Sequence, residues 1–136
     1  MNTILHSIVF GIVLCVSSAG TLGQDKDYET LVKVLTIGEP DSAAIAMHRL
    51  TVTNVRRMFA VDRELFELEK TVPDLETRVS ELRRQFDPQG RAGSVAVELD
   101  AKVYEAMPEI AQILQRQKIS AREYQLTRLA GFLAAM

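Results

Sequence analysis

Few side chains in this sequence could do chemistry, and Asp62 is the most informative of them. In a helix over residues 52–70, about 100° per residue places Asp62 between Met58 and Phe59, inside the apolar arc. A carboxylate at that position is costly to desolvate unless it is paired. We therefore expect donors from another helix, and the candidates for this polar cluster are Arg122, Tyr124 and Arg128.

A catalytic role for Asp62 would require a second positioned titratable group in a cleft, and no sequence pattern supplies one. Of the two histidines, His6 lies in the apolar N-terminal segment, which leaves His48, and one histidine makes no metal site. No phosphate-binding loop or acyl-transfer motif is present. The sequence predicts no catalytic, cofactor-binding or metal site. The Asp62 cluster is interpreted as a structural contact between helices or as a carboxylate that reaches solvent.

The charge pattern argues against nucleic acid as a partner. Sixteen basic and 18 acidic residues give a net charge of -2, which creates no attractive field for phosphates. The C-terminal third is locally basic, but no aromatic residues alternate with its charges, so we interpret it as a solvated face. The basic residues there are Arg116, Lys118, Arg122 and Arg128.

The first 23 residues contain no Asp, Glu, Lys or Arg, and an apolar run from Ile8 to Val16 is followed by small residues. This order is typical of a secretory signal. We predict a signal peptide over 1–23, with cleavage after Gly20 or Gly23, and a periplasmic or secreted domain over 24–136. The alternative is a retained anchor, because the start lacks a basic side chain. Contact with a membrane is expected only through this segment.

The composition is that of one globular domain. A chain of 136 residues with 47% hydrophobic and 25% charged residues can enclose one sizeable core. Cys15 is the only cysteine and would leave with the signal. Disulfides, thiolate metal sites and cysteine nucleophiles are then excluded from the processed domain.

Helical periodicity dominates the rest of the chain and predicts an all-α fold. Residues 39–42 are predicted to form a turn, 43–50 is ambiguous, and 87–93 is a loop. The architecture expected is a compact bundle of five or six short helices, preceded by the signal-peptide helix. The predicted helices cover 25–38, 52–70, 71–86, 95–107, a short stretch from Pro108, and 120–136.

Three local patterns sharpen this prediction. Thr51, Thr71 and Ser94 are placed to cap helices, and Ser120 with Glu123 forms a capping box. The helix over 52–70 has a broad apolar face, which we expect to be buried and which carries Val55, Met58, Phe59, Leu65 and Phe66.

The last helix is apolar on both sides, so we expect it at the centre of the bundle. Gly131 in this helix is expected to permit the close approach of a neighbouring helix.

Two segments near the C-terminus carry a family resemblance. They are Met107-Pro108-Glu109-Ile110-Ala111-Gln112-Ile113-Leu114 and Lys118-Ile119-Ser120-Ala121-Arg122-Glu123-Tyr124-Gln125-Leu126-Thr127. The chain resembles a group of small exported, all-helical bacterial proteins of unknown function, whose terminal segment is similar to Ile-Ser-x-Arg-Glu-Tyr-x-Leu-Thr. The resemblance covers residues 50–136 and implies export and a helical fold. It implies no activity.

The function expected from the sequence is therefore a non-catalytic protein-interaction module of the cell envelope, with an unknown protein as partner. One alternative is a carrier or sensor of a small apolar ligand, which requires a dry internal pocket. Another is an envelope chaperone, which requires an exposed, concave apolar face.

Overall fold

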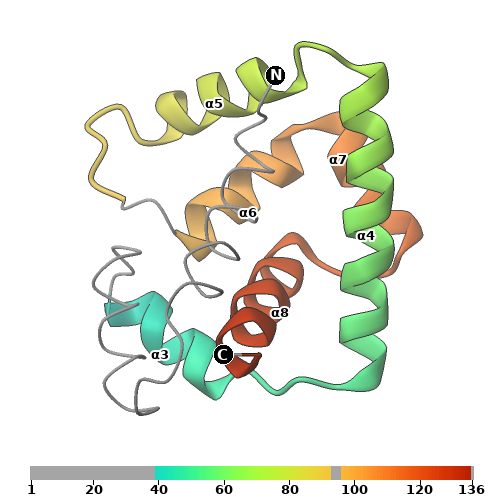
Figure 1. Ribbon diagram of the computed structural model, residues 1–136. Coiled ribbons are helices and arrows are strands. Elements are labelled where there is room, and N and C mark those ends of the chain that lie inside the picture. Colours follow the sequence, from blue (N-terminus) through green and yellow to red (C-terminus); the bar gives the residue numbers. More distant parts are fainter. Residues whose placement is uncertain (1–38, 93–95, 136) are drawn as a thin grey trace, which may run out of the picture.

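The computed structural model describes residues 39–92 and 96–135, and this part of the chain is helical, with no strands (Figure 1). The predicted all-α bundle is confirmed. The predicted signal segment, the helix over 25–38 and the cap at Ser94 lie outside the described residues. The helices are α3 (Glu39–Met47), α4 (Val52–Thr71), α5 (Leu75–Phe86), α6 (Val97–Ala106), α7 (Pro108–Arg116) and α8 (Ala121–Ala134).

The C-terminal helix α8 lies at the centre of the described bundle, as predicted. It packs against α3, α4 and α6, while α7 packs against α4 and α6 (Figure 1). The long helix α4 forms one side of the molecule, and α5 turns away from its C-terminal end and covers α6.

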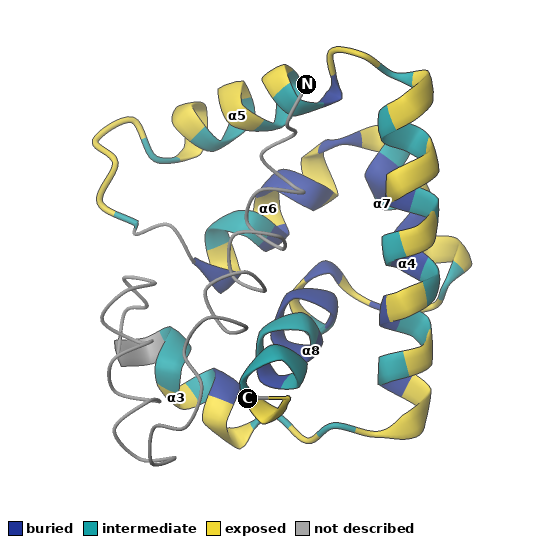
Figure 2. Ribbon diagram, viewed as in Figure 1, coloured by how far each residue is buried: buried dark blue, intermediate teal, exposed yellow. Residues whose placement is uncertain are grey.

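Two apolar clusters fill the interior, and the buried residues line the inward faces of the helices (Figure 2). The smaller cluster lies where α3 meets α8 and includes Ile45, Leu126 and Ala130. The larger one joins α4, α5, α6, α7 and α8, and it holds most of the fully buried side chains. Its members are Met58, Val61, Leu65, Leu75, Ala101, Val103, Tyr104, Met107, Ile110, Ile113, Leu114, Ile119, Ala121 and Tyr124.

Helix starts follow the predicted capping chemistry at two places. The Thr51 hydroxyl accepts a hydrogen bond from the Asn54 backbone N–H at 3.1 Å, and the Asn54 side chain accepts from the Thr51 N–H at 2.8 Å. At α8, the Ser120 hydroxyl accepts from the Glu123 N–H at 3.0 Å, which is one of the two hydrogen bonds of the predicted capping box. Both side chains satisfy backbone donors that a helix start otherwise leaves free.

The prediction was wrong at two other helix starts. Residues 39–42 belong to α3 instead of a turn, because proline is tolerated in the first turn of a helix and Ile45 finds a buried position. Thr71 is the last residue of α4, and its hydroxyl donates to the Leu68 carbonyl at 3.1 Å. It therefore does not cap α5, whose N-cap position is taken by Asp74.

Candidate functional site

The polar cluster predicted around Asp62 is formed mainly by α4 and α8. The Tyr124 hydroxyl donates a hydrogen bond to Asp62 Oδ1 at 2.5 Å. Arg128 Nε lies 3.8 Å from the same oxygen, and its guanidinium carbon lies 5.4 Å from the centre of the Tyr124 ring. The Asp62 side chain is 38% exposed and that of Arg128 is 19% exposed. The structure thus brings together three of the four predicted residues, Asp62, Tyr124 and Arg128, and the Asp62 carboxylate has both a hydrogen-bond donor and a cation beside it.

The fourth predicted residue, Arg122, lies elsewhere, and its assignment to the cluster was wrong. Its Nε donates to Glu98 Oε1 at 2.6 Å, and both side chains are exposed. The reason is angular: Arg122 precedes Tyr124 by two residues, about 200° around the helix, whereas Arg128 follows it by four and shares its face.

Helix α6 adds two residues to the cluster that sequence reasoning missed. The Tyr104 ring stacks on that of Tyr124, with centroids 5.8 Å apart and planes inclined by 28°. Asp100, one turn earlier on α6, accepts from Arg83 Nε at 2.9 Å. The spacing of four between Asp100 and Tyr104 was a usable signal, because residues four apart share a helix face.

Burial controls the electrostatics of this cluster. Desolvation raises the pKa of Tyr104 to about 12 and that of Tyr124 well above 10.0, although the positive charge of Arg128 opposes both shifts. Burial also raises the pKa of Asp100, against the lowering effect of Arg83. Within the described residues, every buried side-chain nitrogen or oxygen has a hydrogen-bond partner. Protonated tyrosines and paired charges suit a role in holding α4, α6 and α8 together.

The buried tyrosines predict a late alkaline titration. We expect Tyr104 and Tyr124 to stay protonated at pH 10.0, and Tyr104 to ionise near pH 12. Because their pKa values are higher in the folded state, the native protein binds more protons, so stability is retained below pH 10 and lost as the pH rises toward 12.

Ultraviolet tyrosinate absorbance, recorded beside helical circular dichroism, measures this titration. The variant Tyr28→Phe removes the third tyrosine and leaves only the two buried ones. A full tyrosinate signal at pH 10 from a protein that is still helical would contradict the packing of both rings.

The single histidine in the described part of the chain makes a structural contact. His48 Nε2 lies 2.9 Å from Thr127 Oγ1, and Thr127 is fully buried in α8. This bond ties the segment between α3 and α4 to the central helix. Among residues 39–92 and 96–135, no three His, Cys, Asp or Glu side chains are grouped as metal ligands would be.

A row of apolar side chains is exposed on the outer face of α4. Val52, Phe59 and Phe66 are 69%, 62% and 43% exposed, and they are spaced seven residues apart. We call these three residues the outer row. The prediction that Phe59 and Phe66 face the core was wrong, because each lies about 100° beyond a buried neighbour, Met58 or Leu65.

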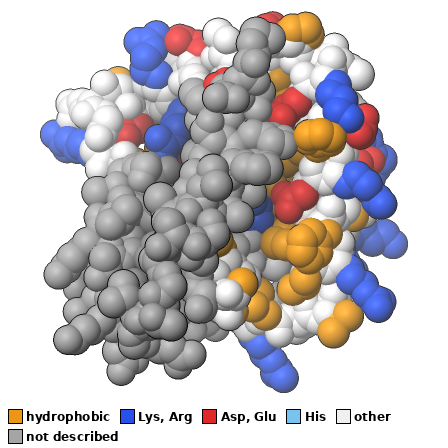
Figure 3. Space-filling view, in the orientation of Figure 1, with side chains coloured by type: hydrophobic (Ala, Val, Ile, Leu, Met, Phe, Trp, Pro, Cys, Tyr) orange, Lys and Arg blue, Asp and Glu red, His pale blue; other side chains and the backbone are white. Residues whose placement is uncertain are grey.

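A row of basic residues runs beside the outer row, four positions after each of its members. We call Arg56, Arg63 and Lys70 the basic row, and all three are exposed. Lys70 Nζ lies 4.1 Å from the centre of the Phe66 ring and 2.9 Å from Glu67 Oε1. Figure 3 shows hydrophobic side chains gathered on the α4 side of the molecule, with Lys and Arg side chains next to them.

A surface hollow of about 270 Å³ lies at the other side of the fold and is lined by Phe86, Asp87, Ala92, Leu99 and Lys102. Its lining combines apolar side chains with two that carry charge. The Asp87 carboxylate already accepts a hydrogen bond from within its own loop, since the Ala92 N–H donates to it at 2.9 Å. This hollow is not the dry apolar pocket that a carrier of apolar ligands needs.

No family model, curated protein or solved structure matches this chain. The resemblance carried by residues 107–114 and 118–127 therefore stays a prediction. No helix in the described residues combines the length and the apolar character needed to cross a membrane. A functional proposal accordingly rests on the geometry described above.

Proposed function

We propose that this chain is a non-catalytic protein-interaction module of the cell envelope, which binds a protein partner through the outer face of α4. The outer row carries the proposal. Single exposed apolar residues are ordinary, but large apolar side chains aligned along one helix face are typical of a contact surface. The envelope location depends on the predicted signal over residues 1–23.

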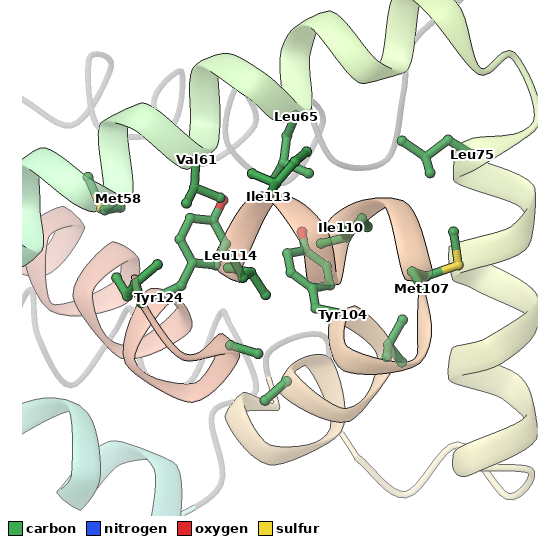
Figure 4. Close-up of a cluster of buried hydrophobic side chains, with 14 residues drawn as sticks. Met58, Val61, Leu65, Leu75, Tyr104, Met107, Ile110, Ile113, Leu114 and Tyr124 are labelled. Atoms are coloured by element: carbon green, nitrogen blue, oxygen red, sulfur yellow. The ribbon is translucent and has the colours of Figure 1, made fainter. Parts of the chain in front are cut away.

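The inner face of α4 supports this role because it holds the helix in place. Met58, Val61 and Leu65 point from α4 toward the core, where they meet Tyr124, Leu114 and Ile113 (Figure 4). The contact of Asp62 with Tyr124 adds a polar attachment on the same helix. The outer row is therefore presented on a fixed support.

The two alternative functions have less support from the described residues. A carrier needs an apolar cavity, and the hollow beside Phe86 is partly charged. A chaperone for unfolded chains needs a broad, concave apolar surface, whereas the outer row occupies one face of a single helix.

Affinity capture from the native envelope tests the proposal. We expect the full-length chain to recover a specific protein, and the double variant Phe59→Ser/Phe66→Ser to recover about tenfold less of it, since truncating a buried aromatic anchor costs about 2 kcal/mol or more. The matched control is Phe86→Ser, because Phe86 on α5 is 46% exposed, close to the value for Phe66. Equal recovery by both variants, or no specific protein, would refute the proposal.

A further inference from the structure

We infer that the segment of the partner that binds α4 is an amphipathic helix with acidic residues along one side of its apolar seam. This inference rests on the proposed function and adds the chemistry of the partner. Its basis is the common spacing of the outer row and the basic row, since both repeat every seven residues. A seven-residue repeat keeps side chains on one face of a helix, so a second helix that lies along this face can contact all three members of the outer row.

The length of the outer row fits such a helix. Val52 and Phe66 are 14 residues apart. At about 1.5 Å per residue the row extends over about 21 Å, which is two heptads. A partner helix of about 15 residues can cover it from end to end.

The charges beside the row select an acidic partner. Arg56 and Arg63 form no ion pair with the described residues, and both side chains are exposed. Lys70 forms an ion pair with Glu67 on the same helix. In paired helices the positions that flank the apolar seam carry opposite charges on the two partners. Asp or Glu residues on the incoming helix would therefore complement the basic row.

A second copy of this chain fits this face less well. Antiparallel pairing of two α4 helices along the outer row would set Arg56 of one copy against Arg63 of the other, and these charges repel each other. Parallel pairing would place the basic row of one copy next to Asp62 of the other. That carboxylate, however, already accepts a hydrogen bond from Tyr124 and lies beside Arg128.

An anionic bilayer also fits less well. Asp62 and Glu69 follow the outer-row residues Phe59 and Phe66 by three positions and border the row on the side away from the basic row. A helix that lies in a bilayer surface buries a broad apolar face beside a polar face rich in Lys and Arg, whereas the outer row is a single line of three side chains with acidic residues on one side.

Site-specific photocrosslinking in the native envelope tests the inference. The photoreactive residue p-benzoylphenylalanine replaces Phe59, Phe66 or, as the control, Phe86 in the full-length chain. We expect the two α4 positions to crosslink to the same protein and the Phe86 position to give no such product. Mass spectrometry of the crosslinked peptide should identify an amphipathic helical segment with Asp or Glu flanking its apolar positions.

A second experiment reverses the charges of the basic row. We expect Arg56→Glu/Arg63→Glu to lower the crosslink yield at position 59 by about tenfold, while Arg84→Glu/Arg91→Glu, which changes the net charge equally, leaves it unchanged. A protein crosslink through a neutral or basic segment, or one insensitive to charge reversal, overturns the inference and leaves the proposed function standing. Crosslinks only to a second copy overturn the inference. Crosslinks only to lipid or to the chain itself, or none, overturn both.

Discussion

The Ile110→Ala variant should lose about 3 kcal/mol of unfolding free energy, because truncating a buried Ile removes apolar contacts and leaves a cavity. Ile110 is 0% exposed and belongs to the larger core cluster, among Met107, Ile113 and Leu114. Residues 16–136 contain no cysteine, so no disulfide within them can offset the loss. Domains of this size have only about 5–15 kcal/mol of stability in total.

Urea unfolding followed by circular dichroism measures this loss. The control is Met47→Ala on α3, because Met47 is 85% exposed and its truncation should change stability by less than about 0.5 kcal/mol. If the two variants unfold at the same urea concentration, Ile110 is not in the core.

Two arginines of the same helix should respond very differently to truncation. We expect Arg128→Ala to cost about 2 kcal/mol, because it removes the cation beside the Asp62 carboxylate and the Tyr124 ring. Arg122→Ala should cost less than about 1 kcal/mol, since Arg122 and Glu98 form an exposed pair. Chemical unfolding of both variants under identical conditions gives the comparison.

A double-mutant cycle isolates the contact itself. Asp62→Leu removes the carboxylate, and its combination with Arg128→Ala should show a coupling energy above about 0.5 kcal/mol, as expected for side chains in contact. Strictly additive effects would mean that Arg128 stabilises the fold through other neighbours, such as the Tyr124 ring.

Local chemistry explains how much of the fold could be predicted. Thr51 and Ser120 cap their helices in the structure because capping depends on residues within one turn. The pairing of Asp62 with Tyr124 was also accessible, since a carboxylate at the edge of an apolar arc requires a donor. Arg122 was assigned by its charge, although its helical angle relative to Tyr124 already placed it on another face.

Other features depend on where neighbouring helices lie, which periodicity does not specify. The apolar arc of α4 is broad, and only the positions of α7 and α8 determine that Met58 and Leu65 are buried while Phe59 and Phe66 are exposed. The same holds for Gly131, where a Cβ atom would meet no described residue within 4 Å, so none of the described helices makes the expected close approach.

The fixed support of α4 bears on how tightly and how fast a surface of this kind can bind. A helix already held by Val61, Leu65 and their core neighbours loses little conformational freedom on association, so the entropic penalty falls mainly on the incoming segment. Variants of the outer row should then differ mostly in how long the complex lasts, and less in how often the two molecules meet.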